Sequence, residues 1–253
     1  MLSRVFRRSP THTMTRRYYC PNLPLKGGKV ALLDTEAQHA IRVMRANAGD
    51  GITLFDGQGN EADATIDAVT RRECFCSANP STRPNRESTT SLHLGIALPK
   101  PDRCRELIER LTEIGVRTVT PVVAARTQRE PSAALLEKLR RTVIEACKQS
   151  GRNRLMTIQA PVTTATFVAE PAVPSETRWI AHPNDECEDV LRSPPASRPD
   201  EETKSYLVAV GPEGGWTDDE VALASQHGFQ CLPLGNRIYR IETAAVVIAA
   251  RLL

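Results

Sequence analysis

Residues 208–217 read VAVGPEGGWT, and this stretch decides the fold of the C-terminal half. Its first residues are those of a buried strand, and the glycines that follow allow a tight turn. Thr217 and the acids after it are typical of a helix N-terminus, where a hydroxyl caps free N–H groups. Such a turn can hold a polar or anionic ligand, and the alternative is a turn that binds nothing. The stretch lacks G-x-G-x-x-G and a Walker lysine, so it does not indicate a nucleotide-binding fold.

A second stretch, LGNRIYRIETAA over residues 234–245, also follows an apolar segment and precedes an apolar helix. Arg237, Arg240 and Glu242 lie between its glycine and that helix. Charges beside apolar segments are costly unless they are paired or bind a ligand. The two hypotheses are therefore a ligand site and a structural cap in which Arg237 or Arg240 pairs with Glu242.

The segments around these stretches alternate between strand and helix patterns. This alternation predicts an α/β domain over residues 92–253, with a parallel sheet covered on both faces. Residues 183–204 are rich in proline and charge, and we interpret them as a variable surface insertion. We expect strands at 92–98, 119–123, 179–181, 206–210 and 231–234, and helices at 102–115, 131–150, 217 onward and 242–253.

Residues 16–80 carry short apolar stretches separated by glycine turns, which is the pattern of a small β-barrel. Residues 52–55 and 62–66 flank one such turn and form a candidate hairpin. Residues 36–45 are expected to form one short helix. Residues 81–91 are polar and contain a proline, which indicates a linker between the two halves.

The first 15 residues, 1–15, contain arginine, serine and threonine but no acid. We expect a disordered tail, and the alternative is an organellar transit peptide. No apolar run approaches the ~18–20 residues that span a bilayer, so we expect a soluble protein. The net charge is +3 and residues 1–17 hold five arginines, so the overall charge does not itself indicate a nucleic-acid partner.

Local clusters carry more information than the overall composition. Residues 138–154 hold six basic side chains against Glu145 alone, which indicates either an RNA contact or a solvated helix face. Cys74 and Cys76 are one residue apart, so a strand would point both to the same face. The seven cysteines lack a C-x-x-C pair and the five histidines lack ligand spacing, so we expect no metal site and no disulfide framework.

Taken in order, motifs from residue 16 onward resemble those of the RsmE-type family of 16S ribosomal RNA uridine-N3 methyltransferases. Each motif is weak by itself, but the shared order is specific. The chain departs from the family's pattern at Glu109-Arg110, where Gln-Lys is frequent, and at Tyr239, where leucine is usual. The matching stretches are HAIRVMR (39–45), LFDG (54–57), TEIGV (112–116), CKQSGRNR (147–154), GPEGG (211–215) and LGNRIYRIETA (234–244).

The resemblance implies two domains and their partners. A PUA-like β-barrel that binds RNA would occupy residues 16–80, and a SPOUT α/β methyltransferase domain with a trefoil knot would occupy residues 92–253. The implied partners are 16S rRNA or the small ribosomal subunit, and a second copy of the chain in a homodimer. The implied location is the cytoplasm, or an organelle if residues 1–15 form a transit peptide.

Particular residues are candidates for these functions. We expect RNA to contact His39, Arg42, Arg45, Arg152, Asn153 and Arg154, and we expect catalysis to involve Arg240 and Glu242. The resemblance itself implies the cofactor site. The cofactor S-adenosylmethionine would contact Ala181, His182, Gly211, Pro212, Glu213, Gly214, Gly215, Leu234, Gly235, Arg237, Ile238, Tyr239, Arg240, Thr243 and Ala244.

The chemistry of such a reaction is compatible with these residue types. Uracil N3 lies on the pairing edge of the base, so the target must be unpaired or flipped out. N3 loses its proton, and an arginine can stabilise the negative charge that develops on the base oxygens. The methyl donor is an activated sulfonium, so positioning supplies much of the rest. A SPOUT methyltransferase for another RNA and a catalytically inactive RNA-binding assembly factor are the competing hypotheses.

Overall fold

The computed structural model describes residues 16–182 and 204–253. The predictions for residues 1–15, for Cys187 and for nearly all of the expected insertion at 183–204 lie outside the described residues. The chain divides into two compact units, Met1–Asn85 and Arg86–Leu253. Among the described residues, no helix is both long and apolar enough to cross a membrane.

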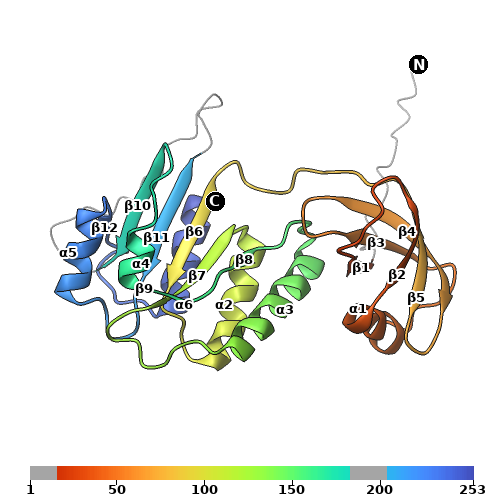
Figure 1. Ribbon diagram of the computed structural model, residues 1–253, viewed down its shortest axis with the longest axis horizontal. Helices are drawn as coiled ribbons and strands as arrows, with labels where there is room; N and C mark the ends of the chain where they lie inside the picture. The colour runs from red at the N-terminus through yellow and green to blue at the C-terminus, as the bar shows by residue number, and fades with distance from the viewer. Residues whose placement is uncertain (1–15, 183–203) are drawn as a thin grey trace, which may run out of the picture. The chain divides into compact units, whose positions relative to one another are not determined.

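The N-terminal unit contains one five-stranded sheet with the order β1-β3-β4-β5-β2 (Figure 1). The expected hairpin is confirmed, because β3 and β4 pair antiparallel, while β1 joins β3 in parallel. The strand pairings place β1 and β2 at the two ends of the sheet, so closure into a barrel stays a prediction. The strands are β1 (Arg16–Tyr19), β2 (Gly28–Leu32), β3 (Gly51–Phe55), β4 (Glu61–Val69) and β5 (Cys74–Ala78).

Cys74 and Cys76 are both fully buried in the core of this unit, as expected for one face of a strand. The single helix expected over residues 36–45 is instead two segments, α1 (Asp34–Gln38) and the π-helical turn η1 (His39–Val43). The wider turn closes through the N–H of Met44, which donates to the carbonyl of His39 at 3.0 Å. Sequence periodicity does not distinguish this insertion from a regular helix.

The C-terminal unit contains a sheet with the order β12-β10-β11-β6-β7-β8, in which every pairing is parallel. The predicted α/β class with a parallel sheet is therefore confirmed. The short strand β9 pairs with β7 outside this order. The strands are β6 (Ser91–Ile96), β7 (Thr118–Val123), β8 (Thr157–Ile158), β9 (Val162–Thr163), β10 (Glu176–Ala181), β11 (Ser205–Val210) and β12 (Gln230–Leu232).

Helices cover both faces of this sheet (Figure 1). Helices α2, α3 and α6 pack together on one face, and α4 and α5 pack on the other. The helices are α2 (Pro101–Ile114), α3 (Ala133–Ser150), α4 (Thr164–Val168), α5 (Asp218–Gln226) and α6 (Ile241–Leu252). The sequence analysis missed β8, β9 and α4, because two-residue strands and a five-residue helix are too short to show a period.

The predicted helix ends agree with local chemistry. Gly115 and Gly151 adopt the left-handed conformation, with φ of 109° and 77°, and end α2 and α3. Ser132 caps α3 through its hydroxyl, which accepts a hydrogen bond from the N–H of Leu135. Thr217 and Glu220 form a complete capping box at the start of α5. The N-terminal caps Ser132 and Thr217 follow the carboxyl ends of β7 and β11, the edge of an α/β sheet where ligands usually bind.

The close contact between β6 and α4 yields the first prediction. A Cβ added at Gly95 would lie 2.3 Å from Cζ of Phe167, which is fully buried and packs edge-on against His93. Because the ring has no room to move, Gly95→Ala should lower the free energy of unfolding by about 1–3 kcal/mol. Chemical denaturation measures this change. Gly51→Ala is the matched control, since a Cβ at Gly51 meets no atom within 4 Å, and equal stability of the two variants would contradict the prediction.

Candidate functional site

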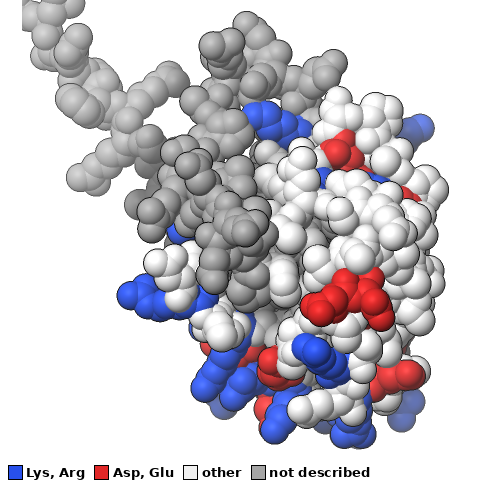
Figure 2. All heavy atoms as spheres, turned by 90° about the vertical axis from the view of Figure 1, so that its left-hand side faces the viewer, with Lys and Arg blue, Asp and Glu red and all other residues white. Residues whose placement is uncertain are grey.

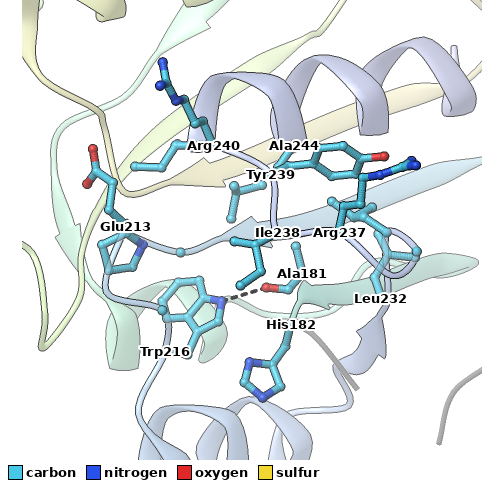
Figure 3. Close-up of a pocket in the computed structure, with 17 residues that line it drawn as sticks. Ala181, His182, Glu213, Trp216, Leu232, Arg237, Ile238, Tyr239, Arg240 and Ala244 are labelled. Carbon is cyan, nitrogen blue, oxygen red and sulfur yellow. Dashed lines mark hydrogen bonds between the residues drawn. The ribbon is translucent and has the colours of Figure 1, made fainter. Parts of the chain in front are cut away.

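A cavity of about 280 Å³ lies at the carboxyl ends of β10, β11 and β12 (Figure 3). Three segments that are far apart in the sequence form it: the end of β10, the glycine turn after β11, and the segment between β12 and α6. The lining residues are Ala181, His182, Val210, Gly211, Pro212, Glu213, Gly215, Trp216, Leu232, Leu234, Gly235, Arg237, Ile238, Tyr239, Arg240, Ile241 and Ala244.

The structure brings together nearly all the residues that the sequence assigned to one ligand. Gly214 and Thr243 are the exceptions, since neither lines the cavity. The sequence analysis missed four lining residues, Val210, Trp216, Leu232 and Ile241. Val210 and Trp216 flank the GPEGG motif, Leu232 lies two residues before Leu234, and Ile241 lies within the 234–244 motif. Their apolar character suits the core as well as a site.

Trp216 connects two of the three segments. Its indole Nε1 donates a hydrogen bond to the carbonyl oxygen of Ala181 at 3.1 Å (Figure 3). A Cβ added at Gly211 would lie 2.9 Å from Cε2 and Nε1 of this indole. Residue 211 is therefore a glycine because the indole occupies the space that a side chain would need.

Arg126 holds the glycine turn from outside the cavity. Its Nη1 donates to the carbonyl oxygen of Gly214 at 2.8 Å and to that of Trp216 at 3.3 Å. A Cβ added at Gly214 would meet the side chain of Arg126 at 3.2 Å, not the cavity. Gly215 has a φ of +71°, which L side chains rarely adopt. The two glycines thus serve packing and backbone conformation, respectively.

Glu220 joins the same turn to the loop after β7. One carboxylate oxygen accepts from the N–H of Ala125 at 3.0 Å and from the hydroxyl of Thr164 at 2.7 Å. The other accepts from the N–H of Thr217 at 3.0 Å. Burial acts to raise the pKa of Glu220, but these hydrogen bonds outweigh it, so its pKa is lower than usual. Sequence reasoning identified Glu220 only as an acid of the first helical turn.

The charged residues at the start of α6 do not form the structural cap that the sequence offered as an alternative to a ligand site. Glu242 lies 3.4 Å from Nη1 of Arg103, so its ion pair is with α2 and not with Arg237 or Arg240. Both of these arginines are exposed, and neither makes a side-chain hydrogen bond or ion pair with any described residue. In Figure 3, Arg240 and Glu213 lie at the same end of the cavity and point away from Trp216.

Ile238 lies across the middle of the cavity and is 91% exposed. Figure 3 places its side chain opposite Trp216 and Ala181. Its exposed apolar surface is available to a ligand in the cavity. The buried Nδ1 of His182 also has no hydrogen-bond partner within the described ranges. The cavity therefore offers both apolar and polar groups for a ligand to satisfy.

The residues that the sequence assigned to RNA fall into two groups. In the N-terminal unit, Arg42 and Arg45 are exposed, and the ring of His39 lies edge-on to Tyr18 at 6.2 Å.

In the C-terminal unit, Arg152 is only 5% exposed. Its guanidinium pairs with Glu87 at 2.6 Å and donates to the carbonyls of Thr112, Gly115 and Val116. Asn153 is also buried, whereas Arg154 is partly exposed. The contacts of Arg152 connect the C-terminal end of α2 to residue 87.

Comparison with known proteins gives the family. A family described as an RNA methyltransferase domain matches residues 86–253, and an RNA methyltransferase PUA domain matches residues 32–78. Ribosomal RNA small subunit methyltransferase E of Synechocystis sp. is 33% identical over 88% of this chain and 72% of its own length. The chain belongs to this RNA methyltransferase family. The resemblance drawn from the sequence motifs is confirmed.

Solved structures of the family share the fold of this methyltransferase. A Legionella pneumophila protein described as a methyltransferase, in complex with the bound cofactor SAM, has a TM-score of 0.84 and 31% identity, covering 94% of this chain and 96% of its own. Ribosomal RNA small subunit methyltransferase E from Neisseria gonorrhoeae, bound to S-adenosylmethionine, has a TM-score of 0.82 and 28% identity, covering 93% and 95%. Within residues 16–182 and 204–253 of this methyltransferase, no group of three His, Cys, Asp or Glu side chains is placed to hold a metal ion.

The buried carboxylate of Glu220 gives this methyltransferase a predictable pH dependence. Because the pKa of Glu220 is lowered by folding, its contribution to stability is present above the unfolded value of about 4.5 and is lost as the pH falls through the folded value. Glu220→Gln should lower the free energy of unfolding by about 1–3 kcal/mol at pH 7, and the difference from wild type should narrow below pH 4.5.

Denaturation curves at pH 7 and at pH 3 test this prediction. Asp219→Asn is the matched control, since Asp219 is an exposed acid of the same helical turn. A constant difference between wild type and Glu220→Gln across the pH range would mean that the ionised carboxylate is not what stabilises the turn.

Proposed function

We propose that this enzyme transfers a methyl group from S-adenosylmethionine to N3 of a uridine in 16S rRNA of the small ribosomal subunit. The observation that carries the proposal is the cavity, because the three motif segments of this family converge on it. The Legionella and Neisseria structures described above, whose fold matches this chain closely, both hold S-adenosylmethionine. The Synechocystis relative supports the small-subunit RNA as the substrate.

The residues of the cavity fit this cofactor. Leu234, Ile238 and Trp216 supply apolar surface for the adenosine, and the glycine turn at 211–215 supplies backbone groups at close range. When bound, the cofactor supplies a methyl group already activated on a sulfonium. The task of the protein is then to exclude water, to orient the target base and to stabilise the charge that develops on it.

Arg240 is the residue that we assign to this charge. Its side chain lines the cavity, and no described residue neutralises it. It is also the N-cap residue of α6, where the helix dipole disfavours a positive charge. An anionic ligand would offset this cost. Glu242 pairs with Arg103, so we assign it the role of holding the start of α6 against α2.

The N-terminal unit is proposed to bind RNA through His39, Arg42 and Arg45. The match of residues 32–78 to a PUA domain of RNA methyltransferases supports this role. In the C-terminal unit, Arg154 is the proposed contact. The buried residues Arg152 and Asn153 would support the surface that presents it.

Several finer features belong to the same proposal. We propose that residues 16–80 close into a PUA-like barrel, that residues 81–91 form the linker, and that residues 92–253 form a SPOUT domain with a trefoil knot. The segment between β12 and α6 runs from the edge of the sheet to the face that carries α2, as a threaded segment must. A homodimer and a location alongside ribosomes, in the cytoplasm or an organelle, complete the proposal.

Two measurements test the function directly. Titration calorimetry should detect binding of S-adenosylmethionine, and mass mapping of 16S rRNA after incubation with enzyme and cofactor should find one methylated uridine. Cofactor binding with methylation of another RNA would favour the alternative substrate. RNA binding without any cofactor binding would favour an inactive assembly factor and would overturn the proposal.

The role of Arg240 has its own test. Arg240→Ala should reduce the single-turnover rate by on the order of 10²-fold, as for loss of one charge-stabilising donor. Arg240→Lys should recover part of the rate, because a point charge replaces a planar fork incompletely. Cofactor affinity and melting temperature should stay close to wild type. A destabilised variant with a normal rate would instead identify Arg240 as a helix cap.

A further inference from the structure

A second cavity, of about 580 Å³, adjoins the first within the C-terminal unit. Pro212 and Glu213 line both cavities, so the two cavities adjoin at the glycine turn. The second cavity opens between the segment after β6, the loop after β7 and the first turns of α3.

Three cations line this second cavity from three different segments: Lys100, Arg129 and Lys138. All three are exposed, and their side chains form no hydrogen bond or ion pair with the described residues. Asp102, Glu130 and Glu213 lie on the same walls, so the charges of the lining are mixed. On the face seen in Figure 2, basic side chains gather toward the lower edge with acids among them, which is the edge where the strands end in Figure 1.

Apolar surface forms the other part of the lining. Leu98, Leu135 and the rings of Pro99, Pro101 and Pro131 contribute to it. A cavity with apolar walls and three cations suits a nucleotide, which has an apolar base face and an anionic phosphate. Its volume lies within the range of small-molecule sites, ~300–1,000 Å³.

The two cavities are held at a fixed separation. The loop after β7 lines the second cavity from Thr127 to Ser132, and the residues just before it grip the glycine turn of the first. Arg126 donates to the carbonyls of Gly214 and Trp216, and the N–H of Ala125 donates to Glu220. One rigid junction therefore positions both cavities, as transfer of a group between two ligands requires.

We propose that the second cavity receives the acceptor nucleotide of the RNA, with its base against the apolar wall and its phosphate near Lys100, Arg129 and Lys138. The inference rests on the proposed function and adds the place where the substrate binds. Pro212 and Glu213 line both cavities, so the acceptor base meets the methyl donor beside these two residues. A donor in the first cavity and an acceptor in the second can thus come into direct contact where the two cavities adjoin.

Two kinds of variant test the acceptor site. Ala134→Trp adds a large side chain to an exposed, cavity-lining position in the first turn of α3. It should lower kcat/KM for RNA by at least tenfold while the affinity for S-adenosylmethionine and the melting temperature stay at wild-type values. Lys138→Ala removes one cation and should weaken RNA binding by about tenfold. It should also reduce the log–log salt slope of RNA binding by roughly 0.7–0.9.

Arg117→Ala is the matched control. Arg117 is exposed at the opposite end of β7 and lines neither cavity, so losing its charge should leave kcat/KM unchanged. If Ala134→Trp unfolds the protein, the test of the acceptor site rests on Lys138→Ala. This variant removes only exposed atoms, so it should fold normally.

The wild-type enzyme separates failure of this inference from failure of the proposed function. Wild type that methylates 16S rRNA, together with both variants at normal kcat/KM, would overturn the acceptor site and leave the function standing. Wild type that neither binds the cofactor nor methylates the RNA would overturn both. A shift from dimer to monomer in Ala134→Trp, measured by light scattering, would make the cavity a subunit contact and would also overturn the inference.

Discussion

The buried carboxylate of Glu220 is the interaction on which the site depends. Its two oxygens accept hydrogen bonds from the loop after β7, from α4 and from the start of α5. A parallel sheet brings the carboxyl ends of its strands to one edge, but it does not fix the loops that leave them. The folded protein keeps the carboxylate charged through hydrogen bonds that outweigh the cost of burial. The glycine turn and the loop after β7 are thereby held as one body.

The shape of the cavity follows from close packing around the glycine turn. The indole of Trp216 fills the space beside Gly211 and reaches the carbonyl of Ala181, so the end of β10 and the glycine turn are joined directly. Arg126 secures the outer side of the same turn. The segment between β12 and α6 closes the cavity and leaves Ile238 exposed to it. Rigid walls with one uncovered apolar side chain are suited to a ligand that is bound in a single orientation.

Charge in this protein is used in two ways, and the presence of an ion-pair partner distinguishes them. Arg152 is buried and pairs with Glu87, and Arg103 pairs with Glu242, so these ion pairs serve the structure. Lys100, Arg129, Lys138, Arg237 and Arg240 line cavities without such partners among the described residues. Cations that form no ion pair are available to an anionic substrate such as RNA. The density of basic residues over 138–154 led us to expect that Arg152 contacts RNA. In the fold, its guanidinium instead pairs with Glu87.

The sequence by itself determined the features that depend on neighbours along the chain. Period, turn glycines and caps such as Thr217 and Gly115 predicted the α/β class and most helix ends, because these signals act over a few residues. Motif order predicted the family and most of the cavity lining. Only the tertiary structure decided which partner each charged side chain has. Arg103 and Glu242 form an ion pair across 139 residues, Glu220 accepts from the N–H of Ala125 across 95, and Arg126 donates to the carbonyl of Gly214 across 88. Contacts over such separations depend on how the helices pack against the sheet, and no local spacing records that packing.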